Sequence, residues 1–272
     1  MKYYPIAENT LELRQICQRP DCPQRSVSIY ITRIVLKFRV MSPTQVTILD
    51  FFIGLAGVLV YFVGTDWAFV LGGVLLQLFQ VLDCVDGEVA RYLISKGELN
   101  RDRAEQAVVE FIQDIVHPIL QPLMFLAFSY GLFVTFKQDW ILILGYIAAV
   151  GSSVDTYVNI VREKLLESAD LEKASRIYKE MADRAGSLVK KIPGGLYLLK
   201  FIIFIVPIPG VMVVLLIVSI LDWLIFPGSN FLLVFGLAIN FKILALAIYA
   251  VIEQVLWFLN ARGSIKSLRQ IS

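Results

Sequence analysis

The stretch that decides the fold is DWAFVLGGVLLQLFQVLDCVDGEVAR, residues 66–91. Its first part is predominantly apolar over roughly 20 residues, the length that an α-helix needs to cross the hydrocarbon core of a bilayer. Its end is polar, with Asp83, Asp86 and Arg91 close together. We therefore expect a transmembrane helix that carries two carboxylates to one edge of the membrane.

Five further stretches of similar length and composition accompany this one. The six predicted spans are approximately 44–64, 66–85, 106–136, 139–161, 196–225 and 229–259. Of the 272 residues, 57% are hydrophobic and only 18% are charged, whereas soluble globular proteins carry about 25% charged residues. The composition excludes a disordered chain and an ordinary soluble enzyme. We expect an all-α integral membrane protein, a bundle of about six transmembrane helices.

Lysine and arginine are distributed unevenly among the segments that connect these spans. Of the 25 basic residues, all but Lys137, Lys200 and Lys242 fall before span one, between spans two and three, between spans four and five, or after span six. Lys242 falls near the middle of the sixth predicted span. Because basic connecting segments stay in the cytoplasm, we expect both termini and the two longer loops on the cytoplasmic side.

A basic segment precedes the first span. Residues 26–40 mix apolar residues with Arg33, Lys37 and Arg39, which favours an amphipathic helix in the membrane interface; a solvated connector is the alternative. The expected organisation is a cytoplasmic segment at 1–43 that includes this helix, a six-helix domain at 44–260 and a cytoplasmic tail at 261–272. The lipid bilayer is an expected partner and nucleic acid is not, and a homodimer is left open.

Two pairs of acidic residues lie at the cytoplasmic ends of spans two and three. Asp83 and Asp86 are three residues apart, and Glu110 and Asp114 are four apart, so each pair shares one face of its helix. Adjacent anions near a membrane are tolerated where they face water or hold a cation. Four carboxylates from two helices could hold two divalent ions about 3.5–4 Å apart and clamp a phosphoryl group. Ion pairs with nearby arginines are the alternative.

The pattern Asp83-x2-Asp86-Gly87-x2-Ala90-Arg91 resembles the first half of the motif of the CDP-alcohol phosphotransferase family. The whole motif is D-x2-D-G-x2-A-R-x8-G-x3-D-x3-D. The family usually has a core of six helices, so the resemblance implies the same bundle that the hydropathy predicts.

The second half of the motif departs from the family. At the family's spacing, the glycine and the two aspartates would fall on Asn100, Ala104 and Val108. A loop that is six residues longer puts Gln106 in the glycine position, and Glu110 and Asp114 in the acidic positions. The segment at 41–49 is also similar to the start of that family's first span. The departure bears on rate and substrate fit more than on architecture, and it leaves open a non-catalytic membrane relative.

The resemblance implies transfer of a phosphoalcohol group to the hydroxyl of a small alcohol or alcohol phosphate, with release of CMP, in phospholipid biosynthesis. The first choice of donor is CDP-diacylglycerol; a CDP-alcohol donor with a lipid or polyol-phosphate (inositol-type) acceptor is the alternative. It implies two divalent ions, Mg²⁺ or Mn²⁺, and Asp114 as the catalytic base. The implied metal ligands are Asp83, Asp86, Glu110 and Asp114, and the implied CDP-binding residues are Gly87, Ala90 and Arg91.

The fourth predicted span carries one polar stripe near its cytoplasmic end. Ser152, Asp155, Asn159 and Arg162 recur at helical spacing. If the stripe faces the interior of the bundle, it could bind a polar acceptor, with Arg162 suited to a phosphate. Hydrogen bonding between helices is an equally good explanation.

Overall fold

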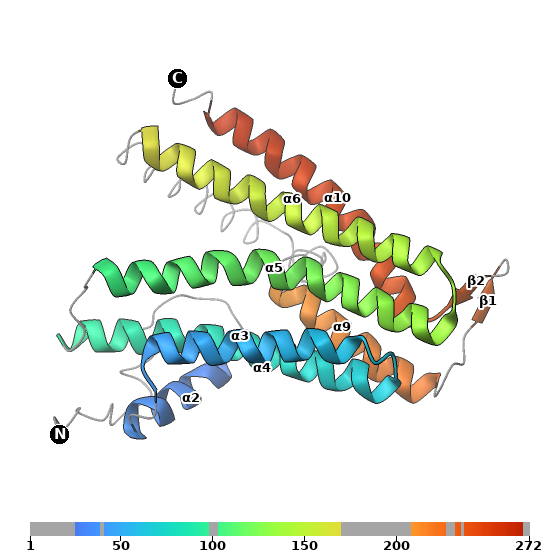
Figure 1. Cartoon of the computed structure of the whole chain (residues 1–272), viewed down its shortest axis with the longest axis horizontal. Helices are drawn as coiled ribbons and strands as arrows, with labels where there is room; N and C mark the ends of the chain where they lie inside the picture. The colour runs from blue at the N-terminus through green and yellow to red at the C-terminus, as the bar shows by residue number, and fades with distance from the viewer. Residues whose placement is uncertain are drawn as a thin grey trace, which may run out of the picture. The chain divides into compact units, whose positions relative to one another are not determined.

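The computed structural model describes residues 25–38, 41–97, 103–169, 208–226, 232–234 and 237–268, with the backbone alone at some positions within them. These residues form seven helices and two short strands (Figure 1). The helices are α2 (Arg25–Phe38), α3 (Pro43–Tyr61), α4 (Asp66–Ser95), α5 (Arg103–Phe136), α6 (Trp140–Ala169), α9 (Ile208–Ile225) and α10 (Phe241–Leu268). The strands are β1 (Leu232–Val234) and β2 (Leu237–Ile239). The expected all-α class is confirmed.

Five helical stretches within the described ranges are long and apolar enough to cross a membrane. They are Pro43–Tyr61, Asp66–Ser95, Pro118–Phe136, Trp140–Val158 and Phe241–Ile265. A shorter apolar stretch, Gly210–Ile225, lies where the fifth predicted span ends, and the first part of that predicted span lies outside the described residues. The protein is therefore a multi-pass integral membrane protein by helix length and hydropathy.

The sixth predicted span begins later in the structure than hydropathy indicates. Helix α10 begins at Phe241, after strands β1 and β2, which pair antiparallel with Leu232 opposite Ile239. The periodicity of a short apolar run does not distinguish a strand from a buried helix. Hydropathy alone therefore assigned the two strands and α10 to one span. The prediction that Lys242 lies near the middle of its span is therefore wrong, because Lys242 is the second residue of α10.

The chain divides into two compact units. The N-terminal unit comprises the described residues of Met1–Val60 and Leu71–His117. Its core contains a buried apolar cluster in which Val46 of α3 packs against Leu82, Val85 and Val89 of α4. Partly buried apolar residues of α2 pack against the same cluster. The core therefore joins α2 and α3 to the part of α4 that carries the acidic motif.

The C-terminal unit comprises the described residues of Tyr61–Val70 and Pro118–Ser272. Helices α6 and α10 lie side by side in it (Figure 1). At Gly151 of α6, an added Cβ would lie 2.6 Å from Nε2 of Gln254 and 2.8 Å from Cβ of Glu253, so glycine permits this approach. Small residues commonly allow close packing of helices in membranes. The tight contact fixes the register of α6 against α10.

Candidate functional site

Helix α4 continues through the acidic motif without a break. It extends to Ser95, well beyond the predicted end of the span at residue 85. Asp83, Asp86 and Ala90 therefore lie along one helical face, as their spacing predicts. Asp86 is 3% exposed, and Asp83 is half-buried. The first acidic pair is thus built into the packed N-terminal unit.

The carboxylate of Asp86 is held by helix α3. The Thr47 hydroxyl donates a hydrogen bond of 2.7 Å to Oδ2 of Asp86, and both side chains are buried. Thr47 is positioned by the start of α3, where Ser42 Oγ accepts from the Gln45 backbone N–H and Gln45 Oε1 accepts from the Ser42 N–H. These reciprocal bonds form a capping box, which fixes where the helix begins. The cap therefore sets which residues of α3 face the acidic motif.

A third carboxylate, Asp50, was not among the predicted site residues. It lies on α3 one turn beyond Thr47, is 3% exposed, and interacts electrostatically with Asp83 and Asp86. Its Oδ1 is buried and has no hydrogen-bond partner among the described residues. Asp50 is the only charged residue in the sequence of α3. An ionisable residue in a membrane span is a functional-site candidate by default, and this signal could have identified it.

Glu88 lies in the same turn of α4 but has a different environment. Its side chain accepts hydrogen bonds from Ser28 Oγ at 2.8 Å and from Thr32 Oγ1 at 2.7 Å. Both hydroxyls lie on α2, one helical turn apart, and all three side chains are buried. Hydrogen bonds to a charged group contribute more than bonds between neutral groups. Glu88 therefore fastens α2 to α4.

Gly87 leaves room for the side chain of Arg91 one turn further along α4. A Cβ added at Gly87 would lie 3.1 Å from Nη1 of Arg91, so the guanidinium lies against this glycine. Arg91 is half-buried, and its Nε has no hydrogen-bond partner within the ranges the structure describes. A guanidinium presents a planar set of donors that suits phosphate oxygens. The Gly87 and Arg91 pair can therefore contact an anionic ligand.

The second predicted acidic pair lies on helix α5. Glu110 and Asp114 are both within Arg103–Phe136, four residues apart, and their side chains lie outside the described residues. Their role as metal ligands stays a prediction. Among the side chains that are described, no group of three or more His, Cys, Asp or Glu residues is arranged to hold a metal ion. The carboxylate oxygens of Asp50, Asp83 and Asp86 are nevertheless donors of the kind that Mg²⁺ and Mn²⁺ prefer. Oδ1 of Asp50 is buried and has no hydrogen-bond partner among the described residues.

The predicted polar stripe lies on α6, in the C-terminal unit. Asp155 Oδ1 accepts a hydrogen bond of 2.5 Å from Asn260 Nδ2 of α10. Ser152 is 1% exposed, and its Oγ has no hydrogen-bond partner in the described part of the chain. The side chains of Asn159 and Arg162 lie outside the described residues. Asp155 thus joins two helices, and the acceptor-binding role of the stripe stays a prediction.

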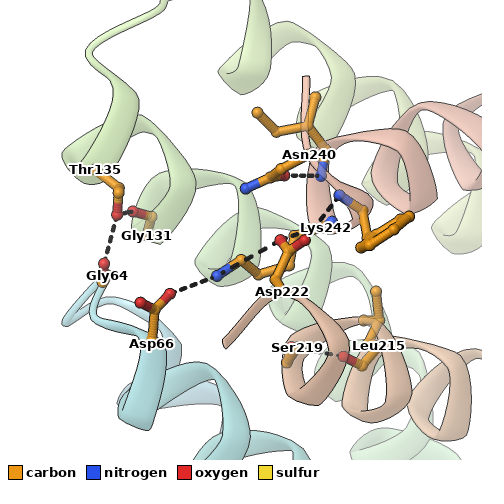
Figure 2. Close-up of polar contacts among 11 residues, drawn as sticks. Gly64, Asp66, Gly131, Thr135, Leu215, Ser219, Asp222, Asn240 and Lys242 are labelled. Carbon is orange, nitrogen blue, oxygen red and sulfur yellow. Dashed lines mark hydrogen bonds and ion pairs between the residues drawn. The ribbon is translucent and has the colours of Figure 1, made fainter. Parts of the chain in front are cut away.

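A second buried acidic cluster lies in the C-terminal unit around Lys242 (Figure 2). Lys242 Nζ forms an ion pair of 2.8 Å with Asp66 Oδ1 and one of 3.7 Å with Asp222 Oδ2. The same ammonium lies 4.6 Å from the centre of the Phe69 ring, a cation–π contact. Asp222 also accepts from the backbone N–H groups of Phe241 and Lys242 at 2.9 and 3.2 Å. The cluster therefore joins the ends of three helices and caps the start of α10.

Around this cluster, the turn between α3 and α4 is held by α5 (Figure 2). Gly64 has a φ of 73°, a left-handed conformation that glycine adopts without strain. The Thr135 hydroxyl donates a hydrogen bond to the carbonyl of Gly64. Asp66 is thereby placed at the first position of α4, where it meets Lys242.

The fold and its acidic motif define a class: a multi-pass helical membrane protein with carboxylates buried at the end of a span. In comparisons with known proteins, no family model matches this chain, and no curated protein matches it.

Proposed function

We propose that this protein is a metal-dependent CDP-alcohol phosphotransferase embedded in the membrane. It transfers a phosphoalcohol group, with CDP-diacylglycerol as the preferred donor, to the hydroxyl of a small alcohol and releases CMP. The observation that carries this proposal is the arrangement at the end of α4. There the buried Asp86 is oriented by Thr47, and the Arg91 guanidinium lies against Gly87 in the next turn.

The proposed chemistry is an in-line displacement at phosphorus. The acceptor hydroxyl oxygen forms a new bond to the phosphorus of the phosphoalcohol group, and the bond from that phosphorus to the CMP oxygen breaks. Asp114 takes the proton of the hydroxyl as general base. Two divalent ions would be held by Asp83, Asp86, Glu110 and Asp114, and when bound they would neutralise the pyrophosphate and the departing CMP.

The residues of the chain contribute binding and orientation. Thr47 keeps one oxygen of Asp86 occupied at 2.7 Å and so limits the directions in which the carboxylate can point. Arg91 is suited to the pyrophosphate of the donor because its fork can contact two oxygens at once. Ala90 and Gly87, on the same turn, are small enough to admit the nucleotide.

The distribution of basic residues supports a cytoplasmic position for both termini and for the proposed site. Helix α2 adds to this support because its exposed residues are of two kinds. Arg33 and Lys37 are cationic, whereas Tyr30, Ile34 and Phe38 are large and apolar. Such a helix suits the interface of an anionic leaflet, close to a lipid donor.

Two alternatives have specific support in the sequence. Arg162 on the polar stripe favours an acceptor that carries a phosphate, such as a polyol phosphate. The departures at Gln106 and Glu110 favour a non-catalytic membrane relative, because glutamate displaces its oxygens by about one bond length, and misplacements near 1 Å can reduce catalysis about 100-fold.

The deciding experiment supplies the purified protein with CDP-diacylglycerol and a panel of alcohols and alcohol phosphates, and measures released CMP. Release should require Mg²⁺ or Mn²⁺, and Asp114→Asn should abolish it. Asp139→Asn makes the same chemical change at an exposed carboxylate and should release CMP at the wild-type rate. Full release by Asp114→Asn would contradict the role of that residue. No release by the wild type from any CDP donor would favour the non-catalytic alternative.

A further inference from the structure

Asp50 is a buried acid that the proposed motif does not use. Its side chain is 3% exposed, and one carboxylate oxygen has no hydrogen-bond partner within the described ranges. A buried polar group left without a partner is unfavourable, and more so when it is charged. Packing alone therefore does not explain why an acid occupies this position on α3.

The register between α3 and α4 brings Asp50 to the motif. The two helices pack antiparallel, with Thr47 bonded to Asp86. The same register recurs further along, where a Cβ at Gly57 would lie 3.1 Å from Cγ of Leu76. Between these two contacts, Asp50 is one turn from Thr47 and Asp83 is one turn from Asp86, so Asp50 faces Asp83.

Three acidic side chains thus meet within the N-terminal unit. The electrostatic interactions of Asp50 with Asp83 and Asp86 are repulsive. Repulsion among carboxylates that are partly removed from water is weakly screened, and the attraction of each carboxylate to a bound cation would outweigh it. No ion pair of Asp50 appears among the residues that the structure describes.

We propose that Asp50 is a further ligand of a divalent cation that it shares with Asp83 and Asp86. This inference rests on the proposed function, because the cation is one of those that would act on the pyrophosphate. As they stand, these three carboxylates do not form a group that could hold a metal ion. Binding therefore includes a change of side-chain rotamer, a common adjustment when a ligand binds. Carboxylate oxygens favour Mg²⁺ and Mn²⁺ over softer metals.

The test measures Mn²⁺ binding to the purified full-length protein by electron paramagnetic resonance, without substrate. Asp50→Asn keeps the shape of the side chain and removes its charge, and it should weaken Mn²⁺ binding roughly tenfold or more. Asp139→Asn should bind Mn²⁺ as the wild type does. Wild-type affinity in Asp50→Asn, or no Mn²⁺ binding by the wild type, would overturn the proposal.

Thermal unfolding supplies a second readout that a packing role would not reproduce. Without metal, Asp50→Asn should melt at or above the wild-type temperature, because burial beside two other carboxylates is unfavourable for an acid and less so for an amide. Added Mn²⁺ should raise the Tm of the wild type and raise that of the variant much less, since a ligand stabilises in proportion to its binding. A lower Tm of the metal-free variant, with an equal response to Mn²⁺, would identify Asp50 as a packing residue. Asp50→Ser repeats the test with a smaller side chain.

The two proposals fail separately. If Mn²⁺ binding depends on Asp50 and no CDP donor yields CMP, the proposed reaction is wrong and the cation ligand stands. If the wild type releases CMP and Asp50→Asn binds Mn²⁺ normally, the reaction stands and the ligand assignment is wrong.

Discussion

Two groups of buried acids in this protein differ in how their carboxylate oxygens are bonded. In the C-terminal unit, Asp66 and Asp222 share the ammonium of Lys242, and Asp222 also accepts two backbone N–H groups. In the N-terminal unit, Asp50 retains a buried oxygen that has no hydrogen-bond partner among the described residues. Acids whose oxygens are occupied by the protein hold helix ends together. An acid whose carboxylate oxygen has no partner within the protein is a candidate ligand for a bound cation or another bound molecule.

The largest effect is expected at Lys242. Lys242→Met removes the cation that Asp66 and Asp222 share and leaves their two carboxylates together. Breaking a buried ion pair in this way is strongly destabilising, by about 3–5 kcal/mol. Unfolding of the purified protein in denaturing detergent should show this loss.

A combined variant distinguishes a structural ion pair from a functional lysine. Lys242→Met together with Asp66→Asn and Asp222→Asn should recover most of the stability, because replacing a whole buried ion pair is often close to neutral. If the single variant were as stable as the wild type, the cluster would not be structural, and the contrast between the two units would fail.

Glu88 tests the same contrast within one unit, with a smaller effect. Glu88→Gln removes the charge that accepts from Ser28 and Thr32, and one hydroxyl loses its acceptor. We expect a loss of about 1–3 kcal/mol in thermal unfolding. Because the Glu88 oxygens are occupied, Mn²⁺ affinity should stay at the wild-type value. A loss of Mn²⁺ binding as large as that of Asp50→Asn would show that occupied acids also take part in the cation site.

Thr47→Val probes the contact between α3 and Asp86. The change preserves shape and removes a 2.7 Å hydrogen bond to a buried carboxylate, so stability should fall by about 1–2 kcal/mol. If Asp86 is a metal ligand, Mn²⁺ affinity should also fall severalfold, since the orientation of a ligand is lost. Thr156→Val is the matched control, because the Thr156 hydroxyl bonds to the carbonyl of Ser152 in its own helix. An unchanged Mn²⁺ affinity in Thr47→Val would remove Thr47 from the site.

The parts of this site that lie on one helix could be predicted from the sequence. Asp83 and Asp86 are about one helical turn apart, as are Gly87 and Arg91, so spacing alone places each pair on one face of the helix. Asp50 lies on a different helix, and its approach to Asp83 depends on the packing register between α3 and α4. No periodicity within one segment contains that register, so the sequence could mark Asp50 as the charged residue of its span but could not place it beside Asp83.

Hydropathy located the five long membrane spans of the described residues but not every element boundary. The apolar run before α10 forms β1 and β2. A short apolar segment has the same hydropathy whether it is a strand or a helix, so hydropathy alone could not separate these strands from the span. The position of Lys242 changed as a result, and so did its interpretation. A lysine near mid-membrane has no evident partner, whereas a lysine at the start of α10 meets Asp66 and Asp222.

Gly87→Ala is expected to have the smallest effect on stability and the clearest bearing on function. Alanine in place of glycine favours a helix by about 0.5–1 kcal/mol. The new Cβ would lie 3.1 Å from the end of the flexible Arg91 side chain, which can shift. The Tm should therefore stay constant or rise slightly. Displacement of the guanidinium should weaken CMP binding severalfold, as measured by calorimetry.

Gly263→Ala provides the matched control, because a Cβ there meets nothing within 4 Å and the helical gain is the same. It should leave CMP binding unchanged. A loss of stability in Gly87→Ala would mean that this glycine is needed for packing. The motif of the N-terminal unit would then be structural, like the ion-paired cluster of the C-terminal unit. Weaker CMP binding at an equal or higher Tm would have a different cause. Glycine would then occupy this position, despite its low helix propensity, because Arg91 and an anionic ligand need the space beside it.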